Sequence, residues 1–107
     1  MIEHWDGTSW RVVANPAPSK GYRTLGRIAV VSANNIWAVG GNASTDHVVT
    51  FIEHWNGTSW SIVSSPNVGS QGNSLVSVAR VPGTNNVWAV GHYTGSSNLQ
   101  TLTEFYC

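Results

Sequence analysis

The side chains best suited to chemistry occur in pairs that repeat along the chain. Glu3-His4 returns as Glu53-His54, and His47 and His92 stand in other contexts. Carboxylate and imidazole groups bind metals and transfer protons. Neighbouring residues of a strand point to opposite faces, however, so these Glu-His pairs do not converge on one metal ion. We therefore expect no metal site and no cofactor.

Catalytic motifs are also missing from the sequence. No H-x-H or C-x-x-C spacing indicates a metal site, and no G-x-S-x-G marks a nucleophilic serine. Residues 39–42, Val-Gly-Gly-Asn, are too short for a phosphate-binding loop. We predict that the chain is not an enzyme. For Glu53 and Glu104 we expect a structural role, with hydrogen bonds across strands or to loop backbone.

The single cysteine, Cys107, is the final residue of the sequence given, which excludes an intrachain disulfide. Two interpretations stay open for it. It is either a small apolar residue at the terminus or the partner in a disulfide between chains.

Charge and hydropathy exclude two classes of partner. Charged residues make up 9% of the chain and the net charge is +0, so there is no basic field to attract nucleic acid. No apolar run approaches the roughly 18 residues of a membrane span, and no signal peptide opens the chain. The compartment stays undetermined, although an extracellular or cell-surface parent protein is compatible with these features. Because Met1 falls directly on a repeated motif, we expect a fragment of a longer repeat protein or an engineered chain.

The positions that would hold these side chains belong to two sequence repeats. The motif IEHWDGTSW at residues 2–10 returns as IEHWNGTSW at 52–60, and NNIWAVG at 34–40 returns as NNVWAVG at 85–91. A period near 50 residues with strand-like content predicts propeller blades. Repeat 1 covers about residues 2–51 and repeat 2 about residues 52–102, within a single unit of residues 1–107.

Each repeat predicts four short strands, and nothing shows helical periodicity. Asp6-Gly7 and Asn56-Gly57 predict tight hairpins between the third and fourth strand types. The chain starts on a third-type strand, so the blade phase is permuted. The predicted strands of the first type are residues 25–31 and 75–81, and those of the second type are 36–40 and 87–91. The third type comprises 2–5, 50–55 and 101–106, and the fourth type comprises 10–13 and 60–63.

These motifs resemble a kelch repeat. Residues 36–41 (IWAVGG), 52–57 (IEHWNG), Trp60 and Pro66 stand in the kelch order of an apolar strand ending in Gly-Gly, an acidic-aromatic strand and a Trp that opens the outer strand. The second copy departs from the pattern, since His92 follows Gly91 and Phe105-Tyr106 replaces His-Trp. The chain is more similar to the Trp-rich, kelch-like repeats of bacterial β-propellers. The resemblance implies four-stranded antiparallel blades and is nearly silent on function.

Two blades are too few for a closed propeller, which has about 4 to 8. The two bare end faces would total on the order of 700 Å², and burying the apolar half of that area gains roughly 10 kcal/mol. We therefore expect copies of this chain to associate head to tail, as a trimer of six blades or a tetramer of eight. A filament or a fragment that needs other blades are the alternatives. A blade shared between chains would seal the joint, in which case either residues 2–5 or residues 102–106 must lie elsewhere.

Six tryptophans occupy three repeated positions and are expected in the structural core. They are Trp5, Trp10, Trp37, Trp55, Trp60 and Trp88. If Trp37 and Trp88 are core residues, replacing either by Ala should cost roughly 3–5 kcal/mol.

The function predicted from the sequence is a self-assembling scaffold or interaction module. The alternative is a carbohydrate-binding, lectin-like propeller in which exposed aromatic rings stack on sugars. Trp55, Trp60 and Tyr93 would then contact the ligand.

Overall fold

The structure, a computed structural model, describes residues 1–16, 22–43, 47–95 and 98–106, within which every regular element is a β-strand. All nine predicted strands are present, and the all-β prediction is confirmed. Several strands are longer than predicted, and Cys107 lies outside the described residues. The strands are β1 (Ile2–Trp5), β2 (Trp10–Val13), β3 (Tyr22–Ser32), β4 (Asn35–Ala43), β5 (Val48–Trp55), β6 (Trp60–Val63), β7 (Gly72–Arg80), β8 (Val87–Thr94) and β9 (Leu99–Tyr106).

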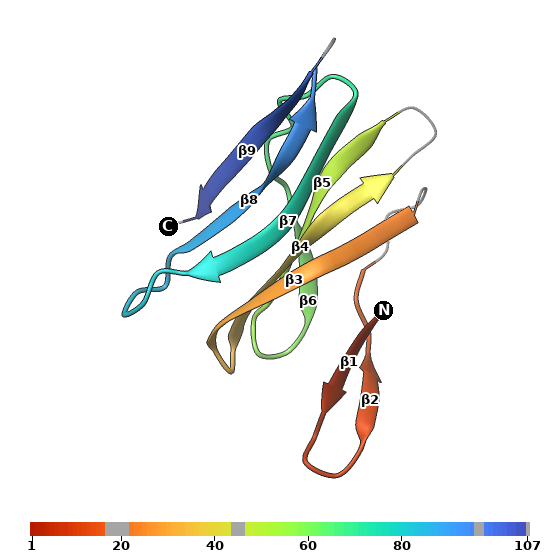
Figure 1. The fold of residues 1–107 in the computed structure, drawn as a ribbon. Coiled ribbons are helices and arrows are strands. Elements are labelled where there is room, and N and C mark those ends of the chain that lie inside the picture. The colour runs from red at the N-terminus through yellow and green to blue at the C-terminus, as the bar shows by residue number, and fades with distance from the viewer. Residues whose placement is uncertain (17–21, 44–46, 96–97, 107) are drawn as a thin grey trace.

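The strands form two antiparallel meanders and a separate hairpin (Figure 1). The first meander runs β3-β4-β5-β6 and has the four strands expected of a blade. The second meander runs β7-β8-β9, and no described strand pairs with the outer edge of β9. One parallel pair, Val48 with Gly72, joins the meanders into a seven-stranded sheet that does not close among the described residues.

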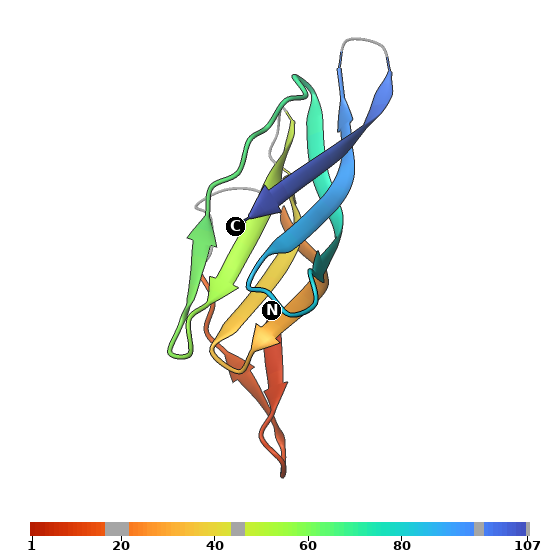
Figure 2. The same ribbon diagram turned by 90° about the vertical axis from the view of Figure 1, so that its left-hand side faces the viewer.

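The N-terminal hairpin, β1 with β2, repeats the pairing of β5 with β6. Its register, Ile2 with Val13 through Trp5 with Trp10, is that of Ile52 with Val63 through Trp55 with Trp60. The tryptophan pair at the turn has the same ring-centroid distance, 5.8 Å, in both copies. The hairpin lies apart from the meanders at one end of the molecule (Figures 1 and 2).

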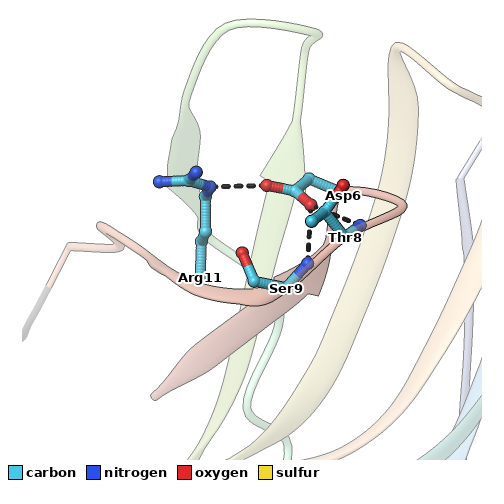
Figure 3. A network of polar contacts seen from close by, with 4 residues as sticks. All are labelled: Asp6, Thr8, Ser9 and Arg11. Carbon is cyan, nitrogen blue, oxygen red and sulfur yellow. Dashed lines mark hydrogen bonds and ion pairs between the residues drawn. The ribbon is translucent and has the colours of Figure 1, made fainter.

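The turns of both hairpins are four residues long and are held by the side chain that begins them. Gly7 and Gly57 have φ of 98° and 101°, which explains the glycine in each Asp/Asn-Gly pair. Asp6 Oδ1 accepts hydrogen bonds from the Thr8 and Ser9 amides (Figure 3). Asn56 Oδ1 accepts the equivalent bonds from Thr58 and Ser59 in the second hairpin. Arg11 pairs with the other Asp6 oxygen and, with these amides, lowers the pKa of Asp6 to about 2.

Each Trp-Ala-Val-Gly motif must end in glycine, because the backbone of the neighbouring strand lies too close for a side chain at that position. A Cβ on Gly40 would lie 1.7 Å from the Thr24 carbonyl oxygen, and one on Gly91 would lie 1.9 Å from that of Ser74. Both glycines face a register shift in the neighbouring first strand, just after Leu25 or Leu75. The repeated motif thus encodes a bulge at the same place in each meander.

The core lies between the two meanders, where β7 lies across β3 and β4. Figure 2 shows the second meander (teal and blue) beside the first (orange to green). Buried residues from both sides meet there: Ala29, Val31, Trp37, Val39 and Ile52 from the first meander, with Leu75, Val78, Val87, Ala89 and Leu102 from the second.

Candidate interaction surface

The only charged side chain that is fully buried among the described residues is Glu53, on β5. Both of its carboxylate oxygens accept hydrogen bonds from the Asn15 side-chain amide, at 3.2 and 3.0 Å. Burial raises the pKa of the Glu53 carboxyl, and the Asn15 hydrogen bond opposes that rise. The expected cross-strand or backbone partner is wrong for Glu53, because its partner is a side chain from the segment that follows β2.

Glu104 on β9 is the repeat counterpart of Glu53, and Ser65 is the counterpart of Asn15. Both Glu104 carboxyl oxygens are buried without a hydrogen-bond partner among the described residues. Burial raises the pKa of Glu104, an effect that the neighbouring Ser65 partly opposes. Ser65, whose hydroxyl also contacts that of Thr50, is shorter than asparagine. The carboxyl group satisfied in one copy is therefore unsatisfied in the other.

Sequence reasoning did not single out Asn15. The signal that could have found it is that both copies place a short hydrogen-bonding residue directly before a proline, at Asn15-Pro16 and at Ser65-Pro66. The glutamate that it meets is 38 residues away, and nothing in the local sequence links the two.

Two cavities lie at equivalent places in the repeat. The first, of about 120 Å³, lies between the meanders, and the second, of about 370 Å³, lies between the N-terminal hairpin and the first meander. Five lining positions correspond across the two cavities: Ile52 with Ile2, Val63 with Val13, Val78 with Ile28, Val87 with Ile36, and Tyr106 with Trp55. Equivalent positions of the repeat thus line both cavities, although the hairpin itself lies apart from the meanders.

Among the described residues, nothing in the lining of the second cavity corresponds to Trp37 and Val39 of the first. Trp37 and Val39 of β4 line the first cavity, and the hairpin has no strand that corresponds to β4. The free edge of β1 lies where such a strand would pair. This cavity therefore has space for residues of the Trp-Ala-Val-Gly type.

Residues of that type are exposed on the far side of the molecule. On β4, the sequence Trp37-Ala38-Val39 is buried on both faces, as its unbroken apolar run predicts. On β8, Trp88 and Val90 are 47% and 43% exposed, whereas their counterparts Trp37 and Val39 are 4% and 1% exposed. The local sequences are nearly identical, so the difference comes from what covers each meander.

The outer face of the first meander is also apolar and is exposed along β3, whereas Ala38 and Glu53 on the same face are buried. Ile28 is 56% exposed there, while its counterpart Val78 is 8% exposed in the core. Val30 beside it is 57% exposed. We call this the outer first face, and we call Trp88, Val90 and the neighbouring Phe105 the outer second face. Exposed apolar faces are typical of surfaces that contact another molecule.

The six repeat tryptophans differ in burial. Trp37 and Trp60 are buried, Trp55 is half-buried, and Trp5, Trp10 and Trp88 are exposed in the single chain. Trp37 packs against His54 and Tyr106 with ring centroids 4.3 and 4.4 Å away, and Trp88 packs on Phe105 at 4.6 Å. For Trp5, Trp10 and Trp88 the core assignment stays a prediction about an assembled state.

The residues predicted to contact sugar do not form one site. Trp55 and Trp60 line the second cavity together, but Trp60 is 8% exposed. Tyr93 packs against the core, near Gly69, and does not line that cavity. Trp5 and Trp10, at the tip of the N-terminal hairpin, form an exposed aromatic pair, as do Trp88 and Phe105.

Other kinds of site have less support. In the part of the chain that the structure describes, no group of three or more His, Cys, Asp or Glu side chains is placed to hold a metal ion. The same residues include no helix with the length and apolarity that a membrane crossing requires.

No protein-family model, curated protein or solved structure matches the chain. Within the chain, the two copies of the repeat can be compared with each other, which sets the buried residues between the meanders against the exposed residues of the outer faces.

Proposed function

We propose that this chain is a self-associating β-repeat unit, a scaffold or interaction module whose two meanders are kelch-like propeller blades. Copies join head to tail, with the outer second face of one against the outer first face of the next. The role requires only complementary surfaces and no catalytic group.

The observation that carries this proposal is the correspondence between the outer faces and the buried interface. Inside the chain, Trp37 and Val39 of the first meander pack toward Val78 and Val87 of the second. Outside it, Trp88 and Val90 repeat the first pair, while Ile28 and Ile36 repeat the second. The two outer faces are thus the two halves of an interface that the chain already forms once.

A contact between two different faces of identical chains is heterologous, so each added copy leaves one face of each kind free at the ends. Such a chain of contacts either closes into a ring or grows into a filament. Three copies give six blades and four give eight, both within the range of propellers. We propose the closed ring, because it leaves neither face exposed.

The proposal is tested by disabling one face at a time. Trp88→Glu places a charge on the outer second face, and Ile28→Glu places one on the outer first face. Each variant alone should be a monomer, because one face is lost. An equimolar mixture should give a dimer and nothing larger, because one intact face of each kind remains. Val68→Glu, at a 61% exposed loop position, is the control and should assemble like the unmodified chain.

Two results of this experiment count against head-to-tail association. If the mixture stays monomeric while the unmodified chain assembles, the two faces do not bind each other. If either charged variant assembles like the unmodified chain, the face that it carries is not part of the contact.

Carbohydrate binding is a second candidate, favoured by the exposed pair of Trp5 and Trp10. Trp10 is 66% exposed and its ring lies 5.8 Å from that of Trp5, a surface suited to stacking on a sugar ring. Titration of tryptophan fluorescence with glucose, galactose, mannose and fucose tests it. A saturable change that Trp10→Ala abolishes supports binding, and an unchanged spectrum with all four sugars counts against it.

A further inference from the structure

We infer that β2 of one copy pairs with the free outer edge of β9 of the neighbouring copy. In this exchange β1 loses its pairing with β2. This inference rests on the proposed head-to-tail association and specifies how the joint is sealed. Its partner is a second copy of this chain.

The need for a choice follows from the register. β9 pairs with β8 as β5 pairs with β4, so that Ala89 faces Glu104 as Ala38 faces Glu53. β1 pairs with β2 as β5 pairs with β6. β1 and β9 are thus counterparts of the same strand, β5. When the second meander of one copy docks on the first meander of the next, β9 of the one and β1 of the other would occupy the same place in the sheet, the place that β5 occupies between β4 and β6.

The amount of structure lost decides which strand keeps that position. β9 makes an eight-residue ladder with β8, and it buries Leu102 and the Glu104 carboxyl. β1 makes a four-residue ladder with β2, and Glu3, His4 and Trp5 are exposed. Removing β9 would break twice as many backbone pairs and open part of the core. Removing β1 exposes little that is not already exposed.

Strand β2 loses nothing in the exchange, because it replaces one four-residue ladder by another. By analogy with β5 and β6, it would pair with β9 from Val13 opposite Thr103 to Trp10 opposite Tyr106. This gives the second meander a fourth strand, which none of the described residues supplies within the chain. Addition of a strand to an open sheet edge is a common mode of protein recognition.

The hydrogen bond between Asn15 and Glu53 keeps β2 in place during the exchange. Asn15 follows β2 directly and is bound to β5 of its own chain. β2 is therefore held beside the outer first face whether or not β1 is paired with it. Figure 1 shows β9 (dark blue) and the N-terminal hairpin (red) on opposite sides of the molecule, so β2 meets β9 only between copies.

A further consequence is that β1 competes with assembly. In the single chain it occupies the edge of β2 that the neighbouring β9 needs. Weakening the pairing of β1 with β2 should therefore tighten association. The edge of β2 is then free in a larger fraction of the chains, and only those chains can bind β9 of a neighbour.

Two proline variants of the full chain test the inference. Adjacent strand residues point their N–H groups to opposite sides, so a double proline removes a ladder bond whichever residue donates it. Glu3→Pro/His4→Pro disrupts β1, and Arg11→Pro/Val12→Pro disrupts β2 at the paired positions. Sedimentation equilibrium should show a dissociation constant lowered several-fold by the first variant and association lost in the second.

A cross-link provides an independent reading of the register. Chains carrying Val13→Cys and chains carrying Thr103→Cys, each also with Cys107→Ser, are mixed and oxidised. A disulfide between the two kinds of chain is expected, seen as a doubled mass on a non-reducing gel. Chains with Gln100→Cys replace the Thr103→Cys chains as the control and should give far less of this product.

The outcomes separate this inference from the proposed function. An unmodified chain that is monomeric overturns both. If the unmodified chain assembles but Glu3→Pro/His4→Pro abolishes assembly, β1 is the incorporated strand and the inference alone is overturned. Absence of the Val13–Thr103 cross-link in an assembling mixture overturns it as well.

Discussion

The side-chain amide of Asn15 bonds both carboxylate oxygens of Glu53, at 3.2 and 3.0 Å, and joins the segment after the N-terminal hairpin to the middle of the first meander. The corresponding pair in the second copy, Ser65 and Glu104, forms no such bond. One chain therefore contains the same polar contact in a satisfied and an unsatisfied form.

Exchanging the short residue between the two copies should shift stability in opposite directions. Asn15→Ser leaves the buried Glu53 carboxylate without its partner and should destabilise the fold by about 1–3 kcal/mol. Ser65→Asn supplies the missing amide to Glu104 and should stabilise it by about 1 kcal/mol. Thr50 keeps its bonds to Asn67 when Ser65 is replaced. Urea denaturation measures both, and a destabilising Ser65→Asn would show that the two sites are not equivalent.

Stability should depend on pH through Glu104. Burial raises its pKa above the 4.5 of a free carboxyl, so the folded chain holds this proton to a higher pH than the unfolded chain does. The corresponding stability is complete below about pH 4.5 and is lost as pH rises through the folded pKa. Glu104→Gln cannot ionise, so its loss over this range should be smaller in urea midpoints measured from pH 4 to 8.

Subtracting the pH curve of Glu104→Gln from that of the unmodified chain leaves the contribution of Glu104 to stability, because the other titrating groups are present in both proteins. Burial lowers the pKa of His54, which therefore costs stability as pH falls below 6.5 in both proteins. Gln100→Ala, on the same strand, is the control and should keep the decline of the unmodified chain. Parallel curves for Glu104→Gln and the unmodified chain would mean that Glu104 is not buried as described.

The motif glycines should tolerate no side chain. Gly40→Ala and Gly91→Ala each drive a methyl group into a backbone carbonyl and should cost about 3 kcal/mol, at the upper end for overpacking. Gly95→Ala, whose Cβ would meet nothing within 4 Å, is the matched control. Thermal unfolding in which all three variants melt together would contradict the bulge geometry.

The tryptophans at equivalent positions should respond differently in the dissociated chain. Trp37→Ala removes a buried ring and should cost about 3–5 kcal/mol. Trp88→Ala should cost only about 1 kcal/mol, mainly the aromatic contact with Phe105. The equal cost expected from the sequence thus does not apply to the single chain. Denaturation below the concentration of association measures this, and equal losses would show that Trp88 is buried there too.

The repeat in the sequence was sufficient to predict the strands and turns. Asp6-Gly7 and Asn56-Gly57 predicted the hairpins, because only glycine adopts their positive φ at no cost. The ends of β3, β4 and β8 were less predictable, since Tyr22, Ala43 and Thr94 are held by ladder pairs rather than by apolar alternation.

The sequence could not predict which copy of a repeated residue is buried. Trp37 and Trp88 share their neighbours in the chain, and only the sheet that covers Trp37 distinguishes them. The contact between Asn15 and Glu53 was equally hidden, because it joins two repeats through a loop rather than along a ladder. Burial and polar satisfaction are tertiary properties here, whereas strand type is local.

The central claim, that copies associate through the two outer faces, is tested most directly by the native mass of the unmodified chain. Light scattering on a sizing column, with reductant present to exclude disulfides through Cys107, gives that mass. Above the concentration of association we predict a single species of three or four times 11.5 kDa. A single species of 11.5 kDa at high concentration would contradict the account, because the outer faces would then remain exposed in solution.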